Sequence, residues 1–332
     1  METRKIQKVG GGTYTVSIPV QWAKNHDIEA GKTAYLYTHR DGSLVVRWNE
    51  KDHSELATTG IELDDTAPEV AERMLVAAYS AGFKEIQLRN SEGLSSAQRR
   101  AIDTCTRGLT GVEINEESTH HVTVQGLLDA SDVSIVQSTT QLQYIALSMY
   151  EAALGFFAGE TTESEHIITR DDEADRIFRL VSRHFNRSLL DLSELDHLGI
   201  TRPQLFEYYG MARQLERIAD HAAKITRCVQ RTEYTLSEEL VTESRAIGEN
   251  ARQVVEDASN AVINGGTTGV AHSALQDCEN VVQAARNLDR SLPDRSPREA
   301  YILTRVLDSI IRTAEYGGNI AEIALRISLR DQ

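Results

Sequence analysis

Short alternations of hydrophobic and polar side chains fill the first fifty residues. The alternating stretches are residues 4–9, 14–18, 33–39 and 44–48. A period of two predicts β-strands, and glycines at 10–12 and the pair Asp41-Gly42 supply the turns between them. Pro19 suits the first turn of a helix, so we expect a short helix from there to about residue 26. Residues 1–50 are therefore predicted to form two β-hairpins around one helix.

The next seventy residues mix the periods of strands and helices. Residues 50–57 are polar and are expected to form a linker. Helices are predicted over 68–81 and 95–107, and strands over 83–88, 112–114 and 121–124. Ser95 is the expected N-cap of the second helix. This small α/β module, residues 58–128, has no phosphate-binding loop and no nucleophile elbow. Three roles are open for it: a spacer, a dimer contact or a sensor of a small ligand.

From residue 131 onward the hydrophobic positions follow the period of an α-helix. Six long helices are predicted, over 131–157, 169–192, 203–231, 237–263, 270–292 and 297–329. They fall into two sets of three, residues 131–232 and 237–332, which form an internal repeat of about one hundred residues, and a glycine-containing break follows the first helix of each set. The predicted fold class is a multidomain, mainly α protein with a β-hairpin head, an α/β module and two three-helix bundles.

Paired carboxylates mark the second and third helices of the first set. Glu216 and Asp220 are four residues apart, as are Asp171 and Asp175, so each pair lies on one side of its helix. A short loop makes the two helices antiparallel neighbours, and four facing carboxylates suit a hard metal ion. We call these four residues the acidic cluster. Two ordinary interpretations are open beside the metal site: a solvated helix face, and acids that complement a helix N-terminus.

The same residues carry a resemblance to a known family. Residues 215–225, Leu-Glu-Arg-Ile-Ala-Asp-His-Ala-Ala-Lys-Ile, resemble the signature helix of PhoU-type phosphate-uptake regulators. Asp171 and Asp175 match the acidic motif on the helix that precedes it in that family. The resemblance covers about residues 131–329 and implies two tandem three-helix bundles (PhoU-like). It also implies that the acidic cluster binds a divalent or ferric metal ion.

The second repeat has lost most of the corresponding acids. Ile311 and Glu315 align with Glu216 and Asp220, while Gln276 and Asn280 align with Asp171 and Asp175. Three of the four charged ligands are thus replaced by neutral groups. A metal is therefore expected in the first bundle only.

The N-terminal segment resembles the AbrB/SpoVT family of swapped-hairpin DNA-binding domains. The similarity lies in residues 5–10, 16–19, 22–24, 31–32 and 41–45. It implies a dimer whose basic face, Arg4, Lys5, Lys8 and Lys24, contacts DNA phosphates. A single unit of this size exposes strand edges and has little core, so pairing with a second copy is also the physical expectation. The alternative is a hairpin that serves only for dimerisation.

Charge is distributed unevenly along the chain. The net charge is −15, yet residues 1–50 carry seven Lys/Arg against five Asp/Glu, which leaves −17 for the remainder. The less acidic N-terminus is therefore where nucleic acid is expected to bind.

Few of the basic residues are lysine, a composition that suits a halophilic, archaeal-like source. There is no long apolar stretch or cysteine pair, so we expect a cytoplasmic protein without membrane insertion, disulfides or structural zinc.

These observations favour a regulator over an enzyme. A di-iron carboxylate enzyme would need two E-x-x-H helices, and the E-x-x-H from Glu163 to His166 is expected in a loop. We predict a DNA-binding regulator of phosphate uptake, at least a homodimer, whose helical domain senses a metal or a partner. In the alternative, the protein binds a phosphate transporter subunit or sensor kinase, and the hairpins only dimerise.

Overall fold

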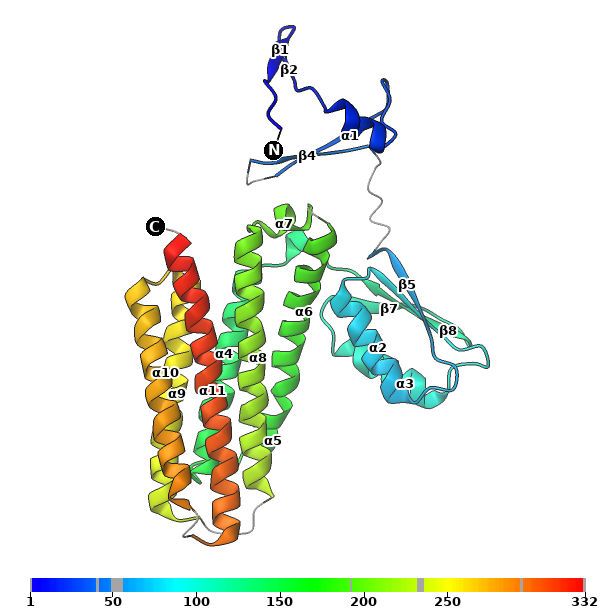
Figure 1. The fold of residues 1–332 in the computed structure, drawn as a ribbon. Coiled ribbons are helices and arrows are strands. Elements are labelled where there is room, and N and C mark those ends of the chain that lie inside the picture. The colour runs from blue at the N-terminus through cyan, green and yellow to red at the C-terminus, as the bar shows by residue number, and fades with distance from the viewer. Residues whose placement is uncertain are drawn as a thin grey trace. The chain divides into compact units, whose positions relative to one another are not determined.

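The structure is a computed structural model that describes residues 2–39, 42–48, 56–191, 193–231, 236–292 and 295–330. The chain divides into two compact units, residues 1–54 and 55–332. The described residues of the first unit form two two-stranded sheets and a short helix, and the second unit contains a four-stranded sheet and the long helices (Figure 1).

Two β-hairpins and one short helix make up the N-terminal unit. Strand β1 (Gln7–Val9) pairs antiparallel with β2 (Thr13–Thr15), and β3 (Tyr35–Thr38) pairs with β4 (Leu44–Arg47). Helix α1 (Val20–Asn25) lies between the hairpins in the sequence, as predicted from Pro19. Gly42 has a φ of 81°, as a tight turn requires, while Asp41 of the predicted turn lies outside the described residues.

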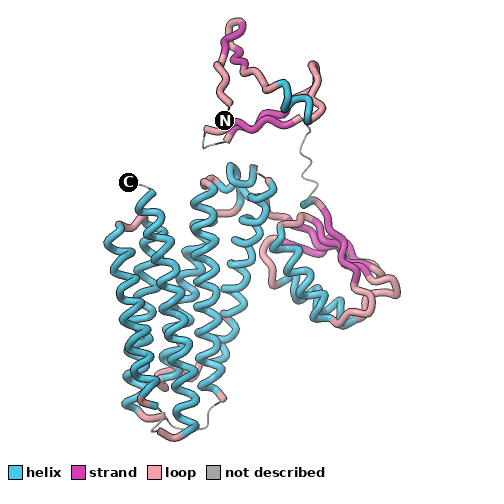
Figure 2. Tube along the Cα trace, in the orientation of Figure 1, coloured by secondary structure: helices cyan, strands magenta, loops and turns pink. Residues whose placement is uncertain are grey.

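A four-stranded sheet with two helices forms the α/β module (Figure 2). Its elements are β5 (Thr58–Glu62), α2 (Pro68–Ala81), β6 (Glu85–Arg89), α3 (Ser96–Arg107), β7 (Val112–Glu117) and β8 (His121–Gly126). The strand order is β5-β6-β8-β7, with β5 parallel to β6 and the other pairs antiparallel. The Ser95 hydroxyl accepts a hydrogen bond from the backbone N–H of Gln98, which confirms the predicted N-cap. Strand β5 was not predicted.

Six long helices build the rest of the second unit. The first set is α4 (Ile135–Phe157), α6 (Asp171–Leu190) and α8 (Arg202–Gln230), and the second is α9 (Glu238–Asn264), α10 (Thr268–Arg290) and α11 (Pro297–Arg330). Two expected loops contain short helices, α5 (Ser164–Thr169) and α7 (Ser193–Leu198), so His166 lies on a helix and not in a loop. Helix α4 begins later than expected because the Ser134 hydroxyl caps it, after a 3-10 turn η2 (Ala130–Asp132).

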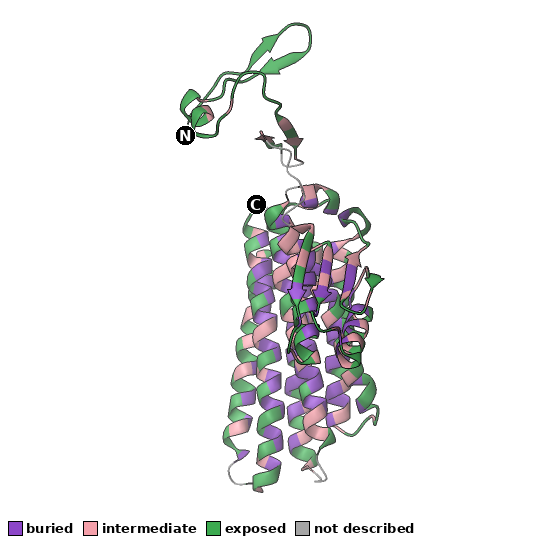
Figure 3. Ribbon diagram, turned by 90° about the vertical axis from the view of Figure 1, so that its right-hand side faces the viewer, coloured by how far each residue is buried: buried purple, intermediate pink, exposed green. Residues whose placement is uncertain are grey.

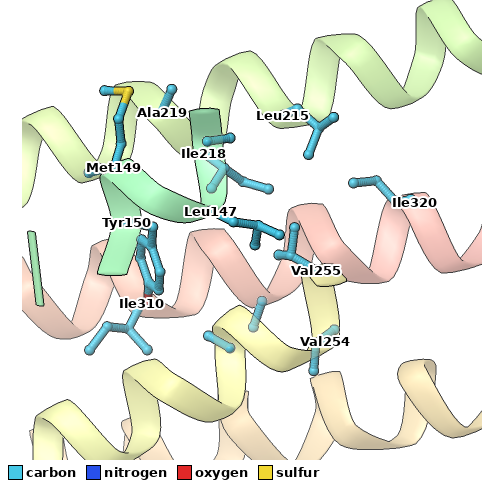
Figure 4. Packing of buried hydrophobic residues seen from close by; sticks show 14 of the residues in the cluster. Leu147, Met149, Tyr150, Leu215, Ile218, Ala219, Val254, Val255, Ile310 and Ile320 are labelled. Carbon is cyan, nitrogen blue, oxygen red and sulfur yellow. The ribbon is translucent and has the colours of Figure 1, made fainter. Parts of the chain in front are cut away.

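Both three-helix sets share one hydrophobic core (Figure 4). Leu215 and Ile218 of α8 pack in the same cluster as Val255 of α9 and Ile310 of α11. The outer faces of these helices are exposed, so buried and exposed positions alternate along each helix (Figure 3). Gly317 permits the close approach of α9 and α11, because a Cβ there would lie 3.1 Å from the backbone nitrogen of Val255. No helix in the described ranges has the length and hydropathy to cross a bilayer.

Helix α6 holds the α/β module against the helical bundle. The guanidinium of Arg183, which is only 6% exposed, donates to the backbone carbonyl of Tyr79 at 2.8 Å and lies over the Tyr79 ring. Asn186 and Arg187 donate to the carbonyls of Ser80 and Gly82 at 2.9 and 3.0 Å. These carbonyls end helix α2, where unpaired acceptors need partners. The module is therefore attached through directional bonds as well as packing.

Candidate functional site

The acidic cluster lies where α6 begins and where α8 passes it. Asp171 and Asp175 occupy the first two turns of α6, and Glu216 and Asp220 are one turn apart on α8. Ala212, Ala219 and Ala223 on α8 are fully buried, and these small side chains let the neighbouring helices pack closely. The sequence spacing thus correctly predicts one face for each pair.

The carboxylates of the two pairs influence one another's pKa values. Burial, and next the nearby Asp220, raises the pKa of Asp171 above its usual value. Burial also raises the pKa of Asp175, to which Asp220 adds. The pKa of Glu216 rises to about 7, first through burial and then through Asp220 and Asp175. Burial is thus the main reason that these carboxylates hold their protons more tightly, and the neighbouring carboxylates add to it.

Basic side chains pair with three of the four acids. Asp171 accepts from Arg227 at 3.3 Å, Asp175 accepts from Arg179, and Asp220 lies 3.9 Å from the ammonium group of Lys224. Sequence reasoning missed these cations. Arg179 and Lys224 each follow their acid by four residues, a spacing that indicates an ion pair. The pairing of Arg227 with Asp171 depends on the packing of two helices and has no local signal.

The chemistry of the acidic cluster suits a hard metal ion, because carboxylate oxygens are the donors that such ions prefer. Burial and, after it, the neighbouring carboxylates raise the pKa of Glu216, and a bound cation would offset the repulsion among these carboxylates. In this arrangement, however, Asp171, Asp175 and Asp220 lie next to basic side chains. Among the residues that the structure describes, no three acidic, histidine or cysteine side chains converge as a set of metal ligands.

In the second repeat, Ile311 packs against the hydrophobic core, and the one aligned acid, Glu315, pairs with Arg312 at 2.9 Å on the same helix. Glu322, which is not an aligned position, lies 3.9 Å from Arg326 with 61% of its side chain exposed. Gln276 hydrogen-bonds Glu279, one turn further along α10. Any metal bound by paired carboxylates would therefore be held by the first set.

His221 follows Asp220 but lies on a different face of α8. Its ring is buried near Tyr316, with 5.8 Å between the ring centroids, and burial lowers its pKa to about 4. A histidine buried in this way is neutral at pH 7. It is thus separated from the carboxylates and offers no acid–base pair with them.

The basic residues predicted to contact DNA lie at the surface of the N-terminal unit. Arg4, Lys5, Lys8 and Lys24 are all exposed, and Arg4 pairs with Glu2 at 2.7 Å. Lys8 lies on β1 opposite Tyr14, and Lys24 is in the last turn of α1. No described residue of this unit is buried, although it carries many large hydrophobic side chains (Figure 3).

Comparison with known proteins places a family domain on the first helical set. Residues 139–229 match the model of the PhoU domain. No curated protein matches the chain. Among solved structures, the phosphate transport system regulatory protein PhoU from Streptococcus pneumoniae aligns with a TM-score of 0.47 and 22% sequence identity, over 58% of this chain and 92% of that one.

Proposed function

We propose that this protein is a DNA-binding transcriptional regulator of phosphate uptake or phosphate-dependent genes, with a metal- or partner-sensing helical domain. One observation carries the proposal: a PhoU domain at residues 139–229 shares a chain with an N-terminal unit whose basic side chains are exposed. Nothing in the acidic cluster offers a nucleophile with a base, which supports regulation over catalysis.

The N-terminal unit needs a partner, and a second copy of the chain is the simplest one. Two-stranded sheets are marginal in water, and this unit leaves Ile6, Tyr14 and Val20 about 70% exposed. Exposed apolar side chains and unpaired strand edges would be buried together by pairing two copies. We expect a dimer or larger assembly in sedimentation experiments. In the full chain, Val16→Glu/Ile18→Glu would shift it toward monomer, and a wild-type monomer at high concentration would contradict the proposal.

DNA binding is tested by titrating the full chain into labelled promoter DNA at several salt concentrations. Four cations from each of two copies allow up to about eight phosphate contacts, so log K should fall with log salt with a slope of about −7. Lys5→Ala/Lys8→Ala should weaken binding at all DNA sequences. Lys84→Ala, an exposed lysine of the α/β module, is the matched control and should bind normally.

The second candidate function is a protein-binding regulator of a phosphate transporter or sensor kinase. The net charge of −17 beyond residue 50 favours it, because that surface repels nucleic acid. Here the hairpins would serve only for dimerisation. If the unmodified protein is dimeric but does not bind DNA at physiological salt, that result would favour this function over the first.

For the metal we propose a single hard ion in the acidic cluster, held by carboxylate oxygens and supplying positive charge that draws α6 and α8 together. Elemental analysis of protein purified without chelators tests for it. Glu216→Gln/Asp220→Asn should abolish Mn²⁺ binding in calorimetry while the protein stays folded. Glu315→Gln, the aligned acid of the second repeat, should bind Mn²⁺ normally. Equal loss in both variants, or no binding by the parent, would refute the site.

A metal or partner can regulate DNA binding only as far as it prefers one arrangement of the protein. Binding free energies are reciprocal, so a metal that tightens DNA binding fivefold must itself bind fivefold more tightly when DNA is present. Measuring Mn²⁺ affinity with and without DNA therefore tests this part of the proposal. Equal affinities would mean that the metal has a structural role.

A further inference from the structure

A second feature of the helical bundle is a cavity of about 900 Å³ between α8 and α11. These helices run side by side in opposite directions, so the end of α8 meets the start of α11 (Figure 1). Five cationic side chains line the cavity: Lys224, Arg227 and Arg231 from the end of α8, and Arg298 and Arg305 from the start of α11. We call this cavity the basic pocket.

The basic pocket is positively charged, whereas the chain as a whole is negatively charged. Residues after position 50 carry a net charge of −17, yet among the residues that the structure describes Asp308 is the one acid that lines this cavity. His221, which also lines it, is neutral at pH 7 because burial lowers its pKa to about 4. The described lining residues therefore have an excess of four positive charges. Like charges gathered in one cavity repel each other unless an anion binds between them.

The helix dipole explains the positions of some of these cations but not of the others. Arg227 and Arg231 lie at the end of α8, where the helix dipole favours positive charge. Arg298 lies in the first turn of α11, where the same dipole disfavours it. Ion pairs with Asp171 and Asp220 engage Arg227 and Lys224, but both acids lie outside the cavity lining. The placement of Arg298 and Arg305 opposite the α8 cations is thus best explained by a shared anionic ligand.

The size and the remaining lining indicate what kind of anion fits. The volume is in the upper part of the range for small-molecule sites and far exceeds one orthophosphate. Pro297, Ile302 and Tyr301 add apolar surface beside the cations. Tyr301 is 59% exposed, and its hydroxyl accepts from the Arg305 guanidinium at 3.1 Å, which fixes the ring at the cavity. An exposed aromatic ring next to phosphate-binding cations is the combination that binds nucleotides.

We propose that the basic pocket binds a nucleoside polyphosphate, with its phosphates on the arginines and its base against Tyr301. Arginine forks match phosphate oxygens bidentately, and several of them suit a chain of phosphoryl groups. The site is built entirely within the helical bundle. It does not rest on DNA binding by the N-terminal unit or on metal binding by the acidic cluster.

The test is calorimetry on the full chain with ATP, tripolyphosphate and orthophosphate, in EDTA so that no metal bridges ligand and protein. ATP should bind saturably and more tightly than tripolyphosphate, and orthophosphate should bind weakly. Arg298→Gln/Arg305→Gln should weaken ATP binding at least about tenfold, which is the loss of one charge-assisted hydrogen bond. Both side chains are exposed, so the thermal midpoint should not change.

Two further variants separate charge and stacking. Arg286→Gln/Arg290→Gln removes the same charge from exposed positions on α10 outside the pocket and should bind ATP normally. Tyr301→Ala should weaken ATP binding about tenfold and leave tripolyphosphate binding unchanged. Absence of saturable ATP binding at millimolar concentration, or equal loss in the α10 control, would overturn the proposal. Tripolyphosphate binding as tightly as ATP would overturn the assignment to a nucleoside.

Discussion

The guanidinium of Arg227 lies 3.3 Å from the carboxylate of Asp171 and also lines the basic pocket. One side chain therefore belongs to both sites. Lys224 is shared in the same way, since it lies 3.9 Å from Asp220 and lines the same cavity. An anion in the pocket and a cation in the acidic cluster would each weaken the hold of these side chains on the carboxylates.

Arg227→Gln should have opposite effects on the two sites. Without this cation Asp171 has less compensation, so Mn²⁺ binding should tighten several-fold, as expected for a coupling of about 1 kcal/mol. ATP binding should weaken, because the pocket loses a phosphate ligand. Calorimetry with each ligand alone measures both effects. The control is Arg107→Gln, which removes an arginine that pairs with Asp103 on α3 and lines neither site. Weakening of both ligands would indicate local misfolding and contradict this relationship.

The buried pair of His184 and Glu194 should control stability in acid. Glu194 is 2% exposed and accepts from His184 Nδ1 at 2.6 Å and from Arg187 at 3.0 Å. Burial alone would raise the pKa of Glu194, but these hydrogen bonds and charges lower it below 4.5 overall. Its contribution is thus fully present above pH 4.5 and is lost as the pH falls through its folded value.

Glu194→Gln should lower the free energy of unfolding by about 3 kcal/mol at pH 7, because it removes one partner of a buried pair. The deficit should shrink as the pH falls below 4.5, where the parent also loses the charge. Urea unfolding across this pH range measures both effects. Glu322→Gln, on an exposed position of α11, should show neither. A deficit that is independent of pH would mean that packing, and not charge, holds this pair.

Gly317→Ala should destabilise the bundle by about 2 kcal/mol through overpacking. The added Cβ of residue 317 would lie 2.9 Å from Val254 Cγ1 and 3.1 Å from the Val255 backbone nitrogen. The backbone of α9 cannot move aside as easily as a flexible side chain can. Gly269→Ala is the matched control, since the nearest atom there is 3.8 Å away. The control should be neutral or stabilising, because alanine favours the helix. Thermal unfolding followed by circular dichroism compares the two.

Arg183→Met should loosen the α/β module from the bundle. The variant loses the charge-assisted bond to the Tyr79 carbonyl, which then keeps only the bond from the Gly82 N–H, at a cost of about 2 kcal/mol. Hydrogen exchange should accelerate in α2 and β8 and remain unchanged in α4 and α8. Equal acceleration throughout the second unit would show that the module and the bundle unfold together.

Periodicity predicts most elements of this fold, and its misses have physical causes. Strand β5 has the sequence Thr-Thr-Gly-Ile-Glu and buries only Ile61, so an edge strand of this kind gives almost no alternating signal. Helices α5 and α7 are six residues long, less than two turns, and tertiary contacts stabilise them. Each pair of the acidic cluster is local to one helix, so the sequence can predict its placement on one face, and that the cluster binds a metal stays a prediction.

The basic pocket was harder to foresee because it joins the end of one helix to the start of another. Lys224, Arg227 and Arg231 follow the spacing of a single helix face, and Arg298 and Arg305 are two turns apart on theirs. Each stripe alone resembles an ordinary solvated surface. Only the antiparallel packing of α8 and α11 brings the two stripes together around one cavity.

Helix α6 carries Asp171 and Asp175 at its first turns and the anchor residues Arg183, Asn186 and Arg187 near its last. Its 20 residues make a rod of about 30 Å. If a helix of this length tilts as a rigid body by about 5° at its acidic end, its other end moves by nearly 3 Å. Binding of an ion between α6 and α8 would thus move the α/β module, including its sheet, as a rigid body.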